Sequence, residues 1–213
     1  MKSSFITVLV AFLAILMGLY PLIYLGLDES TGFQSSKLPE LLGSSVWKIC
    51  FYGHIIFGGL SLLSGWSQFV SKWRNRNLRL HRSLGLLYLI SVSLSGVCGL
   101  YLAFFANGGL ISSLGFGSLA ILWLITTWKA YQSIVAKKIE EHQRWMLRSY
   151  ALTFAAVTLR LWLPALTGLG IAFIVAYKII SWLSWVPNLL VVEWLINRTG
   201  TKPGYNSIRA SKQ

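Results

Sequence analysis

The stretch HQRWMLRSYALTFAAVTLRLWLP, residues 142–164, is long and apolar enough for a membrane helix, yet it carries four basic or titratable side chains. It opens with His142, Arg144 and Arg148, and Arg160 follows near its end. An ionised side chain at hydrocarbon depth costs at least about 2.5–3.5 kcal/mol, so Arg160 indicates a functional role or a structural partner. His142 and Arg160 are 18 residues apart, or about five helical turns, so they lie on one helix face.

The composition around this stretch is that of a membrane protein. Of 213 residues, 55% are hydrophobic, and the mean hydropathy is +0.62. Fifteen of the 19 Lys and Arg residues lie at four places, namely Lys2, 72–82, 129–148 and 198–212. This clustering is typical of cytoplasmic loops. The net charge of +13 therefore predicts topology and contact with anionic lipid headgroups, and it does not favour nucleic-acid binding.

We expect an all-α polytopic helical bundle with six transmembrane helices and both termini in the cytoplasm, because a bilayer requires satisfied backbone groups. Residues 71–82 are expected as a basic cytoplasmic loop. Pro21 is expected to kink the first span or to mark its outer end, and the last span is expected to have a kink at Pro187 or an interfacial final segment. Residues 1–197 form one transmembrane domain, and 198–213 form a basic cytoplasmic tail. The expected spans cover about 4–26, 47–70, 81–105, 110–132, 143–166 and 170–196.

The three histidines each begin a stripe of small or polar residues on a predicted helix. His81 and His142 lie at the cytoplasmic ends of the third and fifth helices, and Tyr88 continues the His81 stripe. A b-type haem needs two imidazoles that face each other across a bundle, so these two histidines are candidate ligands of a haem iron. The alternative is that each is an ordinary interfacial residue in a basic helix entry.

A second candidate site lies toward the outer side, where His54, Arg160 and Lys178 have similar depth and no acidic residue accompanies them within the spans. His54 and Arg160 could hold a quinone carbonyl or a haem propionate, since arginine favours anionic ligands at low dielectric. Alternatively, Arg160 and Lys178 could extend to the outer headgroups.

Further polar residues of the last two helices complete the candidate site residues. Arg148 is a candidate cofactor-binding residue together with Tyr88, and Asn188 and Glu193 are further candidates. Glu193 lies near the cytoplasmic end of the last span and could simply pair with Arg82 or Arg148. No P-loop, nucleophile elbow or HExxH motif is present, which excludes the common hydrolase and NTPase classes.

The two cysteines, Cys50 and Cys98, have no CxxC or metal-binding spacing. Buried inert thiols are the favoured interpretation, and a disulfide on the outer side is the alternative.

Three motifs together resemble a bacterial family of multi-pass predicted membrane proteins, which places the chain in the bacterial inner membrane. They are HRSLGLLY at 81–88 (HRxxGxxY), the 142–164 stretch (HxRWMxRxYA followed by VTLR) and SWLSWVPNLLVVEW at 181–194. The resemblance implies a helix layout similar to b-type cytochromes and ferric-reductase-like proteins. The chain lacks the four in-span histidines of a two-haem cytochrome, so at most one bis-histidine haem is expected.

Three functions follow as hypotheses. The first is a redox protein that binds haem b or a quinone and transfers electrons. The second is a non-catalytic accessory or assembly subunit, with a membrane-protein partner or as a homo-oligomer. The third is a carrier for a small anionic solute or lipid that uses Arg160 and Lys178.

Overall fold

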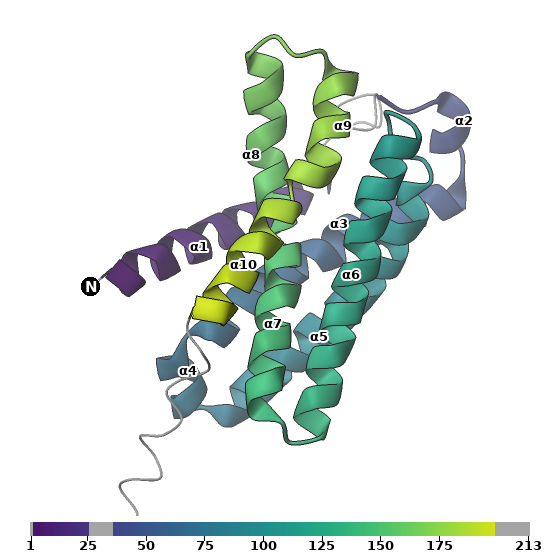
Figure 1. Ribbon diagram of the computed structural model, residues 1–213. Helices are drawn as coiled ribbons and strands as arrows, with labels where there is room; N and C mark the ends of the chain where they lie inside the picture. The colour runs from purple at the N-terminus through teal and green to yellow at the C-terminus, as the bar shows by residue number, and fades with distance from the viewer. Residues whose placement is uncertain (1, 26–35, 199–213) are drawn as a thin grey trace, which may run out of the picture.

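The computed structural model describes residues 2–25 and 36–198, and the chain in these ranges is helical without strands (Figure 1). Its described residues contain six helical segments long and apolar enough to cross a membrane. The prediction of an all-α bundle with six spans is thereby confirmed. The predicted tail lies almost entirely outside the described residues, and the cytoplasmic placement of the termini stays a prediction. The spans cover Thr7–Tyr24, Ser45–Phe69, Leu78–Ala103, Leu110–Val135, Ile139–Gly168 and Phe173–Arg198.

The helix bounds differ from the expected spans by a few residues. The helices are α1 (Lys2–Gly18), the 3-10 helix η1 (Tyr20–Leu25), α2 (Pro39–Leu42), α3 (Ser45–Gly65), the 3-10 helix η3 (Trp66–Phe69), α4 (Ser71–Arg76), α5 (Leu78–Ala103), α6 (Leu110–Val135), α7 (Ile139–Thr153), α8 (Ala155–Gly168), α9 (Phe173–Leu183) and α10 (Val186–Arg198). We call the end with α2 and the 104–109 turn the α2 end, and the end with α4 and the 136–138 turn the basic end (Figure 1).

The expectation of a loop over 71–82 was wrong. Residues 71–76 form α4, and only Asn77 interrupts the helix before α5 begins. Asn77 leaves the helical conformation, and its side chain accepts a hydrogen bond from the Leu80 N–H at 2.9 Å. An asparagine cap satisfies one of the free N–H groups of a new helix, which explains why α5 starts here.

The last two spans are each broken at mid-length. α7 gives way to α8 at Phe154, and α9 gives way to α10 at Ser184 and Trp185. Pro187 lies in the first turn of α10, just after the break, where the missing N–H is tolerated. The expected kink is therefore present, three residues earlier than its proline.

The two breaks lie beside each other and share hydrogen bonds. Thr158 Oγ1 donates to the Ser184 carbonyl. Asn188 Nδ2 donates to the carbonyls of Ala151 at 3.3 Å and Ser184 at 2.9 Å. In a continuous helix, the Ala151 and Ser184 carbonyls would accept hydrogen bonds from backbone N–H groups. At the breaks, the side chains of Thr158 and Asn188 donate to them instead, because a backbone carbonyl surrounded by lipid has no water to bond.

Small residues bring α3 and α5 close together. A Cβ built on Gly58 would lie 3.3 Å from Ser95 Oγ, and one built on Gly99 would lie 2.8 Å from His54 Nδ1. Glycines at such contacts allow close helix approach in a membrane. The α3–α5 contact therefore fixes His54 against Ser95.

A buried hydroxyl network joins α5, α6 and α7. Tyr88 Oη lies 2.7 Å from Ser149 Oγ and 2.8 Å from Thr153 Oγ1. Thr127 Oγ1 lies 2.6 Å from Ser149 Oγ, and Trp123 Nε1 donates to Thr153 Oγ1 at 2.8 Å. Hydrogen bonds between membrane helices contribute about 0.6 kcal/mol each on average, so the network holds these three helices in register.

Candidate functional site

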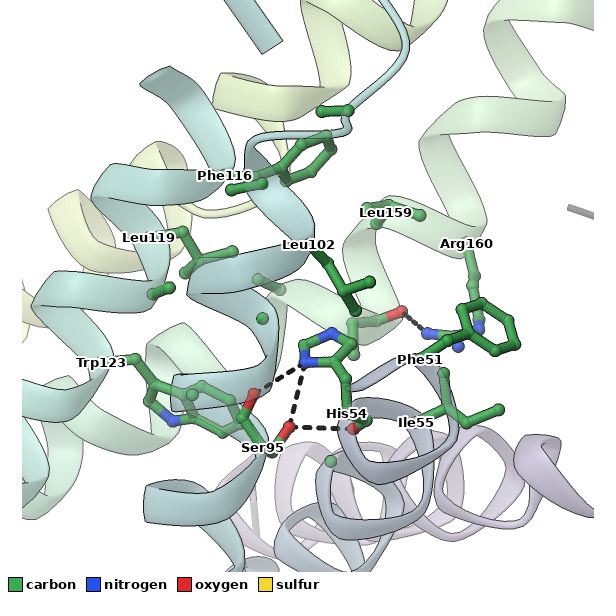
Figure 2. Close-up of a pocket in the computed structure, with 18 of the residues that line it drawn as sticks. Phe51, His54, Ile55, Ser95, Leu102, Phe116, Leu119, Trp123, Leu159 and Arg160 are labelled. Atoms are coloured by element: carbon green, nitrogen blue, oxygen red, sulfur yellow. Dashed lines mark hydrogen bonds between the residues drawn. The ribbon is translucent and has the colours of Figure 1, made fainter. Parts of the chain in front are cut away.

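A cavity of about 530 Å³ lies within the bundle, mainly in the half toward the α2 end. Its walls come from most of the helices, and most of its lining is apolar or aromatic (Figure 2). Its polar lining includes Trp47, Lys37, His54, Ser95, Thr153 and Arg160, and no carboxylate occurs among the described lining residues. This size and this sparse polar lining are typical of sites for lipophilic small molecules.

His54 presents one ring nitrogen to the cavity. Its Nδ1 lies 2.9 Å from the Ser95 carbonyl oxygen and 3.1 Å from Ser95 Oγ. Ser95 Oγ uses its own hydrogen to donate to the His54 carbonyl at 2.8 Å, so Nδ1 carries the proton and donates. The other nitrogen, Nε2, faces away from Ser95 toward Leu102 (Figure 2). In the neutral imidazole, Nε2 is therefore an acceptor.

Arg160 lies deep in the same cavity, within electrostatic range of His54. Its Nη1 donates to the Ala156 carbonyl at 2.9 Å, and its guanidinium lies 4.4 Å from the centroid of the Tyr20 ring. Ala156 is one turn nearer the helix break, so the side chain turns into the bundle. The alternative that Arg160 extends to the α2-end headgroups is not what the structure shows.

Trp47 adds a donor that the sequence did not indicate. The residue is 1% exposed, and its ring stacks on Phe51 with centroids 5.1 Å apart. Its Nε1 has no hydrogen-bond partner in the described part of the chain. A buried polar group without a partner costs about 1–3 kcal/mol, so this N–H favours a ligand with an acceptor atom.

Lys37 also lines the cavity, although in the sequence it was only one charge of a loop. Its Nζ donates to the Phe105 carbonyl at 2.6 Å and to Asn107 Oδ1 at 2.9 Å. Burial lowers the pKa of Lys37 from 10.5 to about 8. The side chain therefore keeps most of its positive charge at neutral pH and loses it in mildly alkaline solution.

The other two histidines lie together at the basic end. His142 Nδ1 is 2.8 Å from the Ala130 carbonyl, which fixes the proton on Nδ1 and leaves Nε2 available. His81 lies within electrostatic range of His142, Arg74 and Arg82. No group of three or more metal-binding side chains occurs among the described residues. A haem held by these two imidazoles stays a prediction.

Two of the remaining predicted site residues form an ion pair away from the cavity. Arg148 Nε lies 2.5 Å from Glu193 Oε1, and Arg148 Nη2 lies 2.9 Å from Oε2. This bidentate pair joins α7 to α10 and agrees with one of the two partners expected for Glu193.

The other predicted residues also serve the fold. Asn188 bridges the two helix breaks, and Tyr88 belongs to the hydroxyl network. Lys178 does not line the cavity, because its stem lies against the 108–109 turn. A Cβ built on Gly108 would lie 2.9 Å from Lys178 Cγ. In the structure, Arg160 and His54 therefore line the same cavity, and Lys178 lies outside it.

These features define a polytopic helical membrane protein with a large, donor-lined internal cavity. The chain belongs to the predicted membrane protein family DUF2306, which matches residues 51–196. This match confirms the family resemblance seen in the three sequence motifs. No curated protein and no solved structure gives a significant match to the chain. The likeness to b-type cytochromes stays a resemblance.

Proposed function

We propose that the protein binds a lipid-soluble quinone in the cavity and takes part in membrane electron transfer. The observation that carries the proposal is the convergence of Trp47, His54 and Arg160 on one apolar cavity without a lining carboxylate among the described residues. Such a lining suits a ligand with an apolar body and a head that accepts hydrogen bonds.

The three polar side chains differ in whether they donate or accept hydrogen bonds. Arg160 and Trp47 donate, so each favours a carbonyl oxygen. His54 Nε2 accepts, so it favours a hydroxyl, because Ser95 holds the proton on Nδ1. A site with both donors and an acceptor suits the quinone and hydroquinone forms of one ligand. His54 Nε2 would hold one hydroxyl of a bound hydroquinone and would accept one of its two protons when a partner electron carrier removes the two electrons.

An anionic lipid or fatty acid shares the acceptor chemistry of a quinone carbonyl. Arg160 and Lys37 favour such a ligand, since both side chains line the cavity. A carboxylate carries no hydrogen for His54 Nε2, whereas the hydroquinone form of a quinone does, which is the reason to prefer a quinone that is bound in both redox forms. The carrier hypothesis would keep Arg160 as a binding charge, with Lys37 in place of Lys178.

Ligand titration distinguishes the two ligands, because Trp47 and Trp123 line the cavity and report on its contents. Purified protein in detergent is titrated with decylubiquinone, with its reduced form decylubiquinol, and in a parallel series with dodecanoate, while tryptophan fluorescence is followed. We expect saturable quenching by both redox forms, and binding of the hydroquinone that weakens in His54→Ala and persists in His81→Ala, a control histidine away from the cavity. Equal hydroquinone affinity in wild type and His54→Ala would contradict the proposal. Saturation by dodecanoate alone would replace the quinone with an anionic lipid.

A second candidate function rests on His81 and His142. The fixed tautomer of His142 leaves Nε2 free, as an axial haem ligand requires, and His81 lies at the same end. Haem b held by this pair would supply one-electron transfer. The test is the visible spectrum of protein expressed with haem precursor, oxidised and then reduced with dithionite. A sharpened α-band that is lost in both His81→Ala and His142→Ala supports this site, and a featureless spectrum rejects it.

A further inference from the structure

Cys50 and Cys98 lie at the same depth on neighbouring helices. Cys50 is five residues after the start of α3 at Ser45, and Cys98 is five residues before the end of α5 at Ala103. At 1.5 Å per residue, each is about 7.5 Å from the α2 end of its helix. Both thiols are free and partly exposed. This depth is near the membrane border, where small water-soluble reagents reach side chains.

The two thiols also lie near each other across the α3–α5 seam. Cys98 Sγ lies within electrostatic range of the Cys50 thiol. A Cβ built on Gly53 would lie 3.2 Å from Cys98 Sγ, and Gly53 is one turn from Cys50 on α3. The missing side chain at Gly53 thus lets Cys98 reach α3. Disulfides need Cα atoms about 4.4–6.8 Å apart, which requires the close helix approach that this seam has.

We propose that Cys50 and Cys98 form a reversible dithiol–disulfide pair that clamps α3 to α5. With a small disulfide as oxidant, one cysteine thiolate attacks it and releases one thiolate, which leaves a mixed disulfide. The second cysteine thiolate then attacks the mixed disulfide and releases the second thiolate. The two cysteines lose two protons and two electrons in total, and the oxidant becomes two thiols.

The clamp acts on the contact that positions His54. Cys50 precedes His54 by about one turn of α3, and Cys98 follows Ser95 by about one turn of α5. In the oxidised state, the disulfide therefore joins α3 to α5 next to the His54–Ser95 hydrogen bonds. In the reduced state, only those hydrogen bonds and side-chain packing hold the two helices together at this place. The thiol pair does not line the cavity, so its oxidation does not depend on which ligand the cavity takes.

Counting free thiols tests the clamp, because the chain has only two cysteines. The full-length protein is equilibrated with mixtures of reduced and oxidised glutathione and then labelled with a maleimide polymer. We expect a direct step from two labels to none, with no glutathione in the oxidised product by mass spectrometry. In Cys50→Ser, the remaining thiol is expected to stop at a glutathione mixed disulfide.

A displaced thiol provides the matched control. Val97 is 62% exposed and lies next to Cys98, so Val97→Cys combined with Cys98→Ser moves the thiol toward the lipid. In this variant, Cys50 should stop at a glutathione adduct, and the internal bond should not form. Two free thiols, or two glutathione adducts, in the oxidised wild type would overturn the proposal. An internal bond in the displaced variant would overturn the geometric argument for the seam.

Discussion

Replacing Arg160 by Met separates ligand binding from folding. The substitution removes the hydrogen bond to the Ala156 carbonyl and the contact with the Tyr20 ring. A hydrogen bond from a charged donor contributes about 1.5–3 kcal/mol, and a desolvated cation–π contact contributes about 2 kcal/mol. Removing the charge also relieves a burial cost of about 2.5–3.5 kcal/mol. The net destabilisation is therefore about 0–2.5 kcal/mol, and the fold should persist.

Quinone binding should fall much further than stability. A ligand that accepts a charged hydrogen bond from Arg160 loses about 1.5–3 kcal/mol in Arg160→Met, which corresponds to a Kd about 10- to 150-fold higher. Quinone titration by tryptophan fluorescence measures the affinity, and unfolding in mixed micelles measures the stability. Lys178→Met is the control, since it removes the same charge outside the cavity and should leave the affinity unchanged.

Two results would refute the reasoning about Arg160. An unchanged quinone affinity in Arg160→Met would show that the guanidinium does not bind the ligand. A loss of stability above about 4 kcal/mol would exceed the net estimate of about 0–2.5 kcal/mol, and it would show that further structural contacts balance the charge.

Three further predictions concern the same cavity. Gly99→Ala should lower quinone affinity and destabilise the protein by about 1–3 kcal/mol, because the new Cβ would lie 2.8 Å from His54 Nδ1. Gly117→Ala is the control, since its new Cβ would have its nearest atom at 3.9 Å, and it should change neither the affinity nor the stability in the same unfolding assay. Trp47→Phe should raise the quinone Kd about 3- to 10-fold, because the N–H is lost as a donor, and should destabilise by about 1–2 kcal/mol through lost packing of a buried ring; an unchanged Kd would show that the N–H does not bind the ligand. For Lys37, with a pKa of about 8, affinity for dodecanoate should fall between about pH 7 and 9 as the charge is lost, while quinone affinity stays level. Because this pKa lies below the unfolded value of 10.5, the free energy of unfolding should rise with pH between about 8 and 10.5. Unfolding measured across this pH range tests the rise, and Lys37→Arg should remove it.

Local patterns were sufficient to predict the six spans, since each is a long apolar run bounded by turns or charges. They indicated a kink near Pro187 in the last span, but they were not sufficient for the break at Phe154 or for the position of the break at Ser184. Neither Phe154 nor Ser184 disfavours a helix strongly, and the breaks are held by Thr158 and Asn188 from neighbouring segments. Contacts of this kind depend on the packed bundle, so a single helix pattern does not contain them.

The candidate site was predicted in part for a similar reason. Depth along the helices correctly placed His54 and Arg160 in one layer, and it placed Lys178 there as well. Depth does not give the direction of a side chain around its helix, and Lys178 turns toward the 108–109 turn instead. Lys37 was missed because it lies in a loop, and Trp47 because an indole near a helix start is typical of an interfacial residue.

The contact between Tyr20 and Arg160 has a consequence for how a ligand arrives. The first span is the least buried of the six, and α1 lies obliquely against the rest of the bundle (Figure 1). Elements with little buried contact open at the lowest free energy, so this wall is the natural side for lateral entry from the lipid phase. The Tyr20 ring already covers the guanidinium of Arg160. A headgroup that binds Arg160 as proposed would compete with that ring for the same cation, and occupancy of the cavity would then be coupled to release of the first helix.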